Sequence, residues 1–389
     1  MKFYYSYKDI LKAPRIALGP QRLFLGTLGV ALAHIVYFML SYLALWIQGN
    51  RLDMVWRHYG LLPLPLGAEL SFWPRVIAFL AVILSLILLL SANTALARSA
   101  YMTLRNNFFY TGNQALEFAR SKTKSVLGVY LTYLFLIFPF IAGALIMSAI
   151  GSFYGFGDIL ISLGTLVYIF AGLILLFVTL SMLISFFLAP AIVAAKEEDG
   201  FGTAVECMRL LWGEPWRLVG YGVLTVVLAL VFTFVFVFAI KVGLIIYSIL
   251  FLPLMHSLAP LLENALAYMQ QSLGGLDPLL RSLFGDEGVR YFYLKKNYMP
   301  IELPLSRTIA SMIIYFFLMI TGYMSLGYFL STINSALVSS VVIFDHHLSG
   351  NNLLSRPDSQ IDREHFEFNP RENTKNLDEK EKAPGKKQP

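Results

Sequence analysis

Six long stretches of the chain contain no lysine, arginine, aspartate or glutamate, and polar segments separate them. Each stretch can supply the roughly 20 apolar residues that a helix needs to cross a bilayer. Lipid offers the backbone no hydrogen-bond partner, so a helix is the form expected for each. We therefore predict an all-α integral membrane protein with spans at about 23–47, 76–97, 125–150, 159–195, 218–250 and 308–344.

Two of these stretches, 159–195 and 308–344, are longer than a bilayer requires. We expect each to form one helix that projects beyond the membrane, with tilting to absorb part of the excess. After Lys241 a second apolar run, 242–262, follows without a turn. This run either extends the fifth helix or re-enters the membrane. Apolar residues then recur at helical spacing, which predicts an amphipathic segment on the outer face at 256–305.

Three polar segments that precede the first, third and fifth spans resemble one another. A shift of 89 residues aligns Glu117 with Glu206 and Arg120 with Arg209, and a shift of 194 residues aligns Arg15 with Arg209. Each segment has the pattern of a short amphipathic helix, a break and then a span. The pattern predicts three repeats of a cytoplasmic amphipathic helix followed by two spans, related by an axis along the membrane normal.

The distribution of basic residues predicts the topology, because lysine and arginine mark cytoplasmic loops. They gather before the first span, between the second and third spans, between the fourth and fifth, and after the sixth. We therefore expect both termini in the cytoplasm and a location in the bacterial cytoplasmic (inner) membrane. The membrane domain is predicted to cover 1–347. Residues 348–389 are polar and poor in aromatics, which predicts a disordered cytoplasmic tail.

Composition removes several classes of function. Of the 389 residues, 57% are hydrophobic and 14% are charged, whereas a soluble domain carries about 25% charged residues. The net charge of +6 follows the topology, so no nucleic-acid partner is expected. The chain has no HExxH, P-loop, GxSxG or CxxC pattern, and therefore no predicted catalytic residue, metal site or cofactor. The single cysteine, Cys207, is either a lipid attachment point or a small apolar contact.

Several short motifs resemble a known group of proteins. They are the residues at 189–192, 200–204 and 209–212, together with the ending at 343–345. They are similar to poorly characterised bacterial multi-pass membrane families that include the membrane domain of some glycerophosphodiester phosphodiesterases. The catalytic domain of those enzymes is absent from this sequence. The resemblance therefore implies an all-helical membrane module without that activity.

Ionisable and amide groups within the spans are candidates for function. His34 lies near the middle of the first span, and it is either a packed structural histidine or a proton or ligand site. Asn93 and Asn334 lie in the second and sixth spans, where amides can hydrogen-bond between helices. At the membrane surface the candidates are Arg15 and the pairs Glu117–Arg120 and Glu206–Arg209, whose spacing permits ion pairing.

Asp345, His346 and His347 follow the last span and combine a carboxylate with two imidazoles, which are metal-ligand groups. Adjacent histidines on a helix face different ways, so metal binding is not the favoured interpretation.

Three functions remain, in descending order of preference. They are a scaffold or accessory subunit that binds lipid or membrane-protein partners, a transporter for a small molecule or lipid, and an intramembrane lipid-modifying enzyme. Only His34 and the cluster at 345–347 offer the last class a reactive group.

Overall fold

The computed structural model describes residues 3–63, 69–153, 155–273 and 299–356. The described residues form helices with short connections and contain no strand. The predicted all-α fold is therefore confirmed. Part of the outer-face segment predicted at 256–305, and most of the tail predicted at 348–389, lie outside the described residues.

Six of the described helices are long and apolar enough to cross a membrane. The shortest has 28 residues, and a helix of that length spans about 42 Å, which exceeds the roughly 30 Å of a hydrocarbon core. The chain is thus a multi-pass membrane protein. The six spans are α3 (Pro20–Ile47), α5 (Phe72–Leu104), α6 (Gly112–Gly151), α8 (Thr165–Lys196), α10 (Pro215–Phe251) and α13 (Leu305–Ser349).

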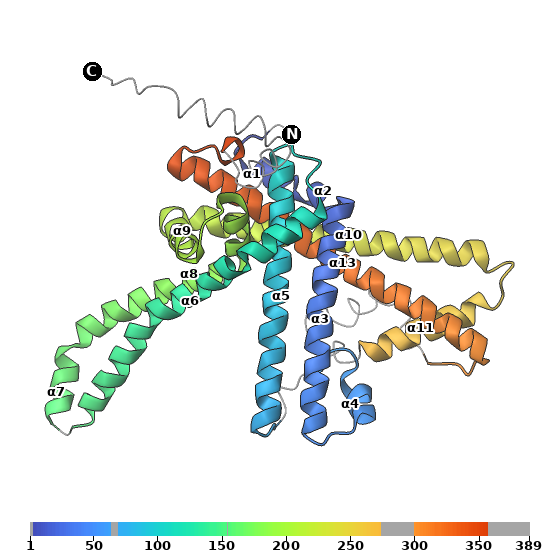
Figure 1. The fold of residues 1–389 in the computed structure, drawn as a ribbon, viewed down its shortest axis with the longest axis horizontal. Helices are drawn as coiled ribbons and strands as arrows, with labels where there is room; N and C mark the ends of the chain where they lie inside the picture. The colour runs from blue at the N-terminus through green and yellow to red at the C-terminus, as the bar shows by residue number, and fades with distance from the viewer. Residues whose placement is uncertain (1–2, 64–68, 154, 274–298, 357–389) are drawn as a thin grey trace, which may run out of the picture.

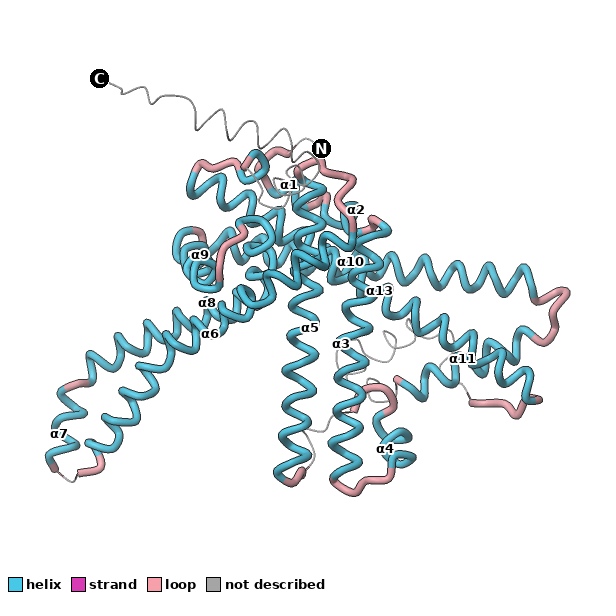
Figure 2. Tube along the Cα trace, viewed as in Figure 1, coloured by secondary structure: helices cyan, strands magenta, loops and turns pink. Residues whose placement is uncertain are grey.

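The spans form three hairpins, α3 with α5, α6 with α8 and α10 with α13, which spread apart from one shared end (Figure 1). We call this shared end the closed end. It also contains four short elements: α1 (Tyr7–Ile10), α2 (Ala13–Ala17), α9 (Gly200–Gly213) and the 3-10 turn η3 (Leu353–Ser355). The opposite tips of the hairpins are the open end. Loops lie mainly at the closed end and at these tips (Figure 2).

The closed end holds the largest buried apolar cluster of the described chain. Ile16, Tyr101, Ile192, Leu210 and Phe344 belong to it, so it draws on all three hairpins and on α9. Tyr101 donates a hydrogen bond to the carbonyl oxygen of Leu353 at 2.7 Å, which ties the second span to the residues that follow the last. Packing of this kind holds the three hairpins together at one end.

Two glycines allow α3 and α13 to approach closely. A Cβ added to Gly26 would lie 2.5 Å from the carbonyl oxygen of Gly327, and a Cβ on Gly327 would lie 2.4 Å from the backbone nitrogen of Thr27. No real side chain tolerates such distances, so both positions require glycine. Small residues at helix crossings are the usual device for close packing in membranes.

At the open end, α4 (Leu52–Tyr59) and residues 60–63 fold back beside α3. Gly60 has φ +56 and ψ −129, a conformation that side chains disfavour, and a Cβ there would lie 2.2 Å from the carbonyl oxygen of Ser272. The backbone N–H of Leu61 donates to that same oxygen at 2.8 Å. The loop between α3 and α5 therefore docks onto the end of α11 (Leu258–Ser272).

Two details of the helices differ from the sequence prediction or complete it. The stretch at 159–195 is not one helix, because α7 (Phe156–Leu163) ends at Gly164 and α8 begins after it. Glycine weakens a helix interior, which explains this position for the break. The run after Lys241 extends α10 as far as Phe251 and then turns into α11.

The second predicted repeat also departs from the expected pattern. Breaks precede the spans of the first and third units, at Gly19–Pro20 and at 213–215. In the second unit α6 is one continuous helix of 40 residues, so the amphipathic segment and the span are not separated. No proline occurs between Gly112 and Pro139 to interrupt it.

Candidate functional site

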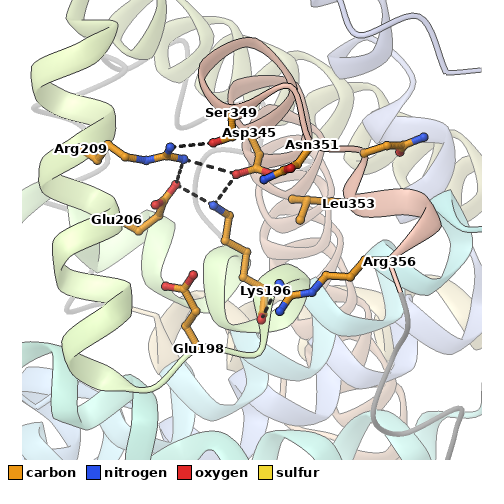
Figure 3. Close-up of a pocket in the computed structure, with 10 residues that line it drawn as sticks. Lys196, Glu198, Glu206, Arg209, Asp345, Ser349, Asn351, Leu353 and Arg356 are labelled. Carbon is orange, nitrogen blue, oxygen red and sulfur yellow. Dashed lines mark hydrogen bonds and ion pairs between the residues drawn. The ribbon is translucent and has the colours of Figure 1, made fainter. Parts of the chain in front are cut away.

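The main polar site lies at the closed end and consists of Lys196, Glu206, Arg209 and Asp345, which we call the ion cluster (Figure 3). Lys196 is the last residue of α8, and Asp345 lies in the last two turns of α13. Glu206 and Arg209 lie three residues apart on α9. The cluster thus joins the ends of two hairpins through the short helix between them.

Local structure explains how α9 reaches this position. Glu197 adopts a left-handed conformation, φ 59 and ψ 21, which ends α8 immediately after Lys196. Asp199 then caps α9, because its side chain accepts a hydrogen bond from the backbone N–H of Gly202 at 2.8 Å. A three-residue turn therefore reverses the chain and brings Glu206 back over the end of α8.

The distances within the ion cluster are those of charge-assisted hydrogen bonds. Lys196 Nζ lies 2.8 Å from Glu206 Oε1 and 2.5 Å from Asp345 Oδ1. Arg209 donates to Glu206 Oε1 at 2.6 Å and more weakly to Asp345 Oδ1 at 3.3 Å. Two cations and two carboxylates make the cluster neutral as a whole.

The cluster is buried, which makes its internal pairing important. Lys196 is 8% exposed and Asp345 is 2% exposed. Burial alone would raise the pKa of Glu206, but hydrogen bonds from Arg209 and Lys196 outweigh burial and lower that pKa below its ordinary value. Contacts with Glu206 and Asp345 outweigh the effect of burial on Arg209 and raise its pKa. Removing one partner of such a group would leave an uncompensated buried charge.

A cavity of about 500 Å³ adjoins the ion cluster. Ser349, Asn351, Asn352, Leu353 and Arg356 form one side of it, and Glu198 lies on the other side beside Lys196 (Figure 3). Burial raises the pKa of the Glu198 carboxyl above its usual value, although nearby Lys196, Arg356 and Arg209 oppose this effect. The cavity is therefore lined mainly by charged and polar groups.

A second buried cation, Arg98, fastens α5 to the end of α8. Its guanidinium donates to the carbonyl oxygen of Ala194 at 2.9 Å and to Glu197 Oε1 at 3.0 Å. It also lies 4.1 Å from the centre of the Phe118 ring, within range of a cation–π contact. With the ion cluster, Arg98 links all three hairpins through polar contacts.

His34 is held between three elements. Its Nε2 lies 2.9 Å from the carbonyl oxygen of Leu61, which can only accept, so Nε2 carries the proton. Its Nδ1 lies 2.5 Å from the hydroxyl of Tyr323 on α13, which therefore donates. Both ring nitrogens are engaged in holding residues 60–63 against the spans. This geometry favours the interpretation of His34 as a structural residue.

The two asparagines form the predicted kind of contact. Asn334 Nδ2 donates to Asn93 Oδ1 at 3.0 Å, between α13 and α5, and also to the carbonyl oxygen of Leu330 at 2.8 Å.

Cys207 is fully buried, and burial raises the pKa of its thiol. A small apolar contact is therefore its role in this fold, because an enclosed thiol offers no surface for lipid attachment.

The predicted surface pairs behave differently. Glu206 and Arg209 form an ion pair, whereas Glu117 and Arg120 are exposed and make no ion pair within 4 Å in the described chain. Arg15 is exposed on α2. The segments around Glu117 and Glu206 are similar in sequence, but only the second lies against a buried carboxylate from another span, that of Asp345. The sequence similarity did not reveal this difference.

The group at 345–347 does not converge. Asp345 points into the ion cluster, His346 stacks on Tyr5 at 4.0 Å between ring centres, and His347 is exposed. Among the residues that the structure describes, no three His, Cys, Asp or Glu side chains are placed to hold a metal ion.

Sequence reasoning did not identify Lys196, Arg98, Glu198 or Arg356 as site residues. Three charged residues of the closed end were instead treated as the limits of apolar runs: Arg98, Lys196 and Asp345 end the second, fourth and sixth stretches. Each of them is buried in the structure. A charged residue that directly follows small or apolar residues, as Lys196 follows Ala194 and Ala195, was the one pattern in the sequence that could have indicated a buried charge.

Comparisons with protein-family models, with curated proteins and with solved structures find no match for this chain. The resemblance to the membrane domain of glycerophosphodiester phosphodiesterases gains no support from them.

Proposed function

We propose that this protein is a membrane scaffold or accessory subunit whose three hairpins bind the transmembrane helices of partner proteins. The observation that carries the proposal is the spread of the hairpins from the closed end (Figure 1). In the most apolar 18-residue windows of α6, α10 and α13, only 0%, 11% and 6% of residues are buried by the chain itself. Long apolar faces thus remain for contacts other than those within the chain.

The small residues on these faces support protein partners over lipid alone. Beside Gly143 on α6, Gly172 on α8 and Gly243 on α10, a Cβ would meet nothing within 4 Å. Elsewhere in the chain, as at Gly26, glycines allow helices to pack closely. Glycines on open faces would allow a partner helix the same approach, since small residues are enriched at helix interfaces in membranes.

The proposed orientation puts the closed end and both termini in the cytoplasm of a bacterial inner membrane. Basic residues support it: Lys8, Lys12, Arg15, Arg105, Arg120, Lys122, Lys124 and Arg217 belong to segments of the closed end. Among the described residues, the segments of the open end carry fewer, with Arg51, Arg57, Arg75 and Arg307 beyond or near the span ends. Labelling of single cysteines introduced at Lys8 and Arg51 in a Cys207→Ser background would test this orientation.

The test of the scaffold role is extraction into lipid nanodiscs, followed by mass spectrometry of the proteins that remain bound. A stoichiometric membrane-protein partner is expected. Gly143→Leu and Gly243→Leu should reduce the bound partner by blocking close approach, whereas Ile146→Leu, three residues after Gly143 on the same exposed face of α6, should not. The proposal fails if no protein is retained, or if the glycine variants retain as much partner as the control.

A second function, transport, is favoured by one observation. Residues 60–63 are not helical, and the carbonyl oxygen of Leu61 contacts His34, which lies about 20 Å along α3 from its open end. Non-helical backbone at membrane depth often lines a transport site. A small molecule or lipid that moves across vesicles containing the wild-type protein, and does not move with His34→Ala, would favour transport.

A further inference from the structure

The cavity beside the ion cluster has a charge pattern that the cluster itself does not explain. The cavity lies between the end of α8, the helix α9, the end of α13 and residues 349–356 (Figure 3). Six charged side chains line it, three cations and three carboxylates. The ion cluster accounts for two of each and is neutral. The remaining pair is Glu198 and Arg356.

Glu198 and Arg356 face the same cavity without neutralising each other. In the described parts of the chain, neither makes an ion pair within 4 Å. Arg356 reaches only the carbonyl oxygen of Lys196, at a long 3.5 Å. Two opposite charges that line one cavity but remain apart are suited to a ligand that carries both signs.

The side of the cavity that lies across from Glu198 offers donors. Asn352 Oδ1 accepts from the Tyr5 hydroxyl and from the backbone of Leu354, which orients the amide and leaves its NH₂ group to donate. Ser349 Oγ accepts from Arg209 at 2.7 Å and keeps its own O–H as a donor. Together with the Arg356 guanidinium, these donors can match the several oxygens of a phosphate.

We propose that this cavity binds a phosphoethanolamine group, with its ammonium at Glu198 and its phosphate at Arg356. A quaternary ammonium is disfavoured because it has no N–H to donate to the Glu198 carboxylate. The described lining also contains no aromatic side chain of the kind that surrounds such cations. This site is independent of the partner-binding role proposed for the hairpins.

Two sources could present this group. The cavity lies where α8 and α13 end, at the level expected for lipid headgroups, so phosphatidylethanolamine is one source. A water-soluble phosphodiester such as glycerophosphoethanolamine carries the same group. Both share the ammonium and the phosphate, and only the lipid also requires a membrane.

The test is native mass spectrometry of the full chain released from nanodiscs that contain equal amounts of phosphatidylethanolamine, phosphatidylcholine and phosphatidylglycerol. Wild-type protein is expected to retain phosphatidylethanolamine at least about tenfold over the other two lipids. Glu198→Gln and Arg356→Gln should each reduce that preference about tenfold, since each removes a charged contact. Neither side chain is part of the ion cluster, so both variants should fold.

Glu214→Gln and Arg217→Gln are matched controls, because these residues form an ion pair on the surface near α9 and do not line the cavity. They should keep the preference of the wild type. Competition by soluble glycerophosphoethanolamine identifies a water-soluble source, and retention despite it identifies the lipid; either result supports the proposal. Equal retention of the three lipids, or an unchanged preference in Glu198→Gln, would overturn it.

Discussion

The closed and open ends of this molecule are held together by different means. At the closed end, apolar packing, glycine contacts and two buried cations join all three hairpins. At the open end, the short helix α7 joins α6 to α8, and among the described residues only the first and third hairpins are linked, through residues 60–63 and α11. The contrast indicates a fold whose stability is concentrated at one end, which leaves the other free for other contacts.

The largest effect on this contrast is expected from Lys196→Met. The substitution leaves Glu206 and Asp345 as buried carboxylates that share only Arg209, and it should lower the free energy of unfolding by roughly 3–5 kcal/mol. Thermal unfolding in detergent would measure this loss. Lys124→Met is the control, because Lys124 is exposed on α6 and should have little effect. Similar stability of the two variants would show that the ion cluster does not hold the closed end together.

A matched pair of isoleucines compares the two ends directly. Ile192 is fully buried at the closed end, and Ile249 is 65% exposed near the end of α10. Ile192→Ala should cost roughly 2–5 kcal/mol of stability because it leaves a cavity, and Ile249→Ala should change stability by less than about 0.5 kcal/mol. Equal losses in chemical unfolding would contradict the proposed difference between the ends.

Two glycines give a smaller and sharper comparison. Gly26→Ala would force α3 and α13 apart and should cost about 1–3 kcal/mol, because the obstacle is the backbone of Gly327. Gly220→Ala meets nothing within 4 Å and should be neutral, or slightly stabilising since alanine favours helices. Thermal unfolding of both variants would measure the difference, and an unaffected Gly26→Ala would show that the spans can separate there without cost.

The smallest effect is expected from mild acid. Glu206 faces Lys196 from α8, Arg209 from its own helix and Asp345 from α13, with Glu198 nearby, and its folded-state pKa lies below the ordinary value. The stability that it contributes is therefore complete above the pKa of the unfolded chain and is lost as pH falls through the folded pKa. Unfolding measured from pH 7 downward should show this loss, and Glu206→Gln should flatten the profile.

The helical architecture could be predicted from the sequence, because backbone groups without hydrogen-bond partners are so costly in lipid that few structures other than helices can cross a membrane. All six apolar stretches correspond to long helices. The position of the break at Gly164 and the continuity of α6 could not be predicted, since both depend on local helix preference and not on the hydrophobic pattern.

The site was only half predictable. The spacing of Glu206 and Arg209 indicated their pair, but the pairing of Lys196 with Asp345 depends on how α8 and α13 meet in three dimensions. The equally spaced Glu117 and Arg120 remain apart in the fold. Local spacing identifies which residues can pair, and tertiary packing decides which of them do.

The separation of Lys196 and Asp345 by 149 residues also bears on how the protein is made. At roughly 5–20 residues per second, a ribosome needs on the order of ten to thirty seconds to add Asp345 after Lys196. During that interval Glu206, only ten residues further along the chain, is the one of the lysine's two carboxylate partners that has already been made. The closed end is therefore completed only when the final span has been inserted, which makes the last helix the step that commits the three hairpins to one structure.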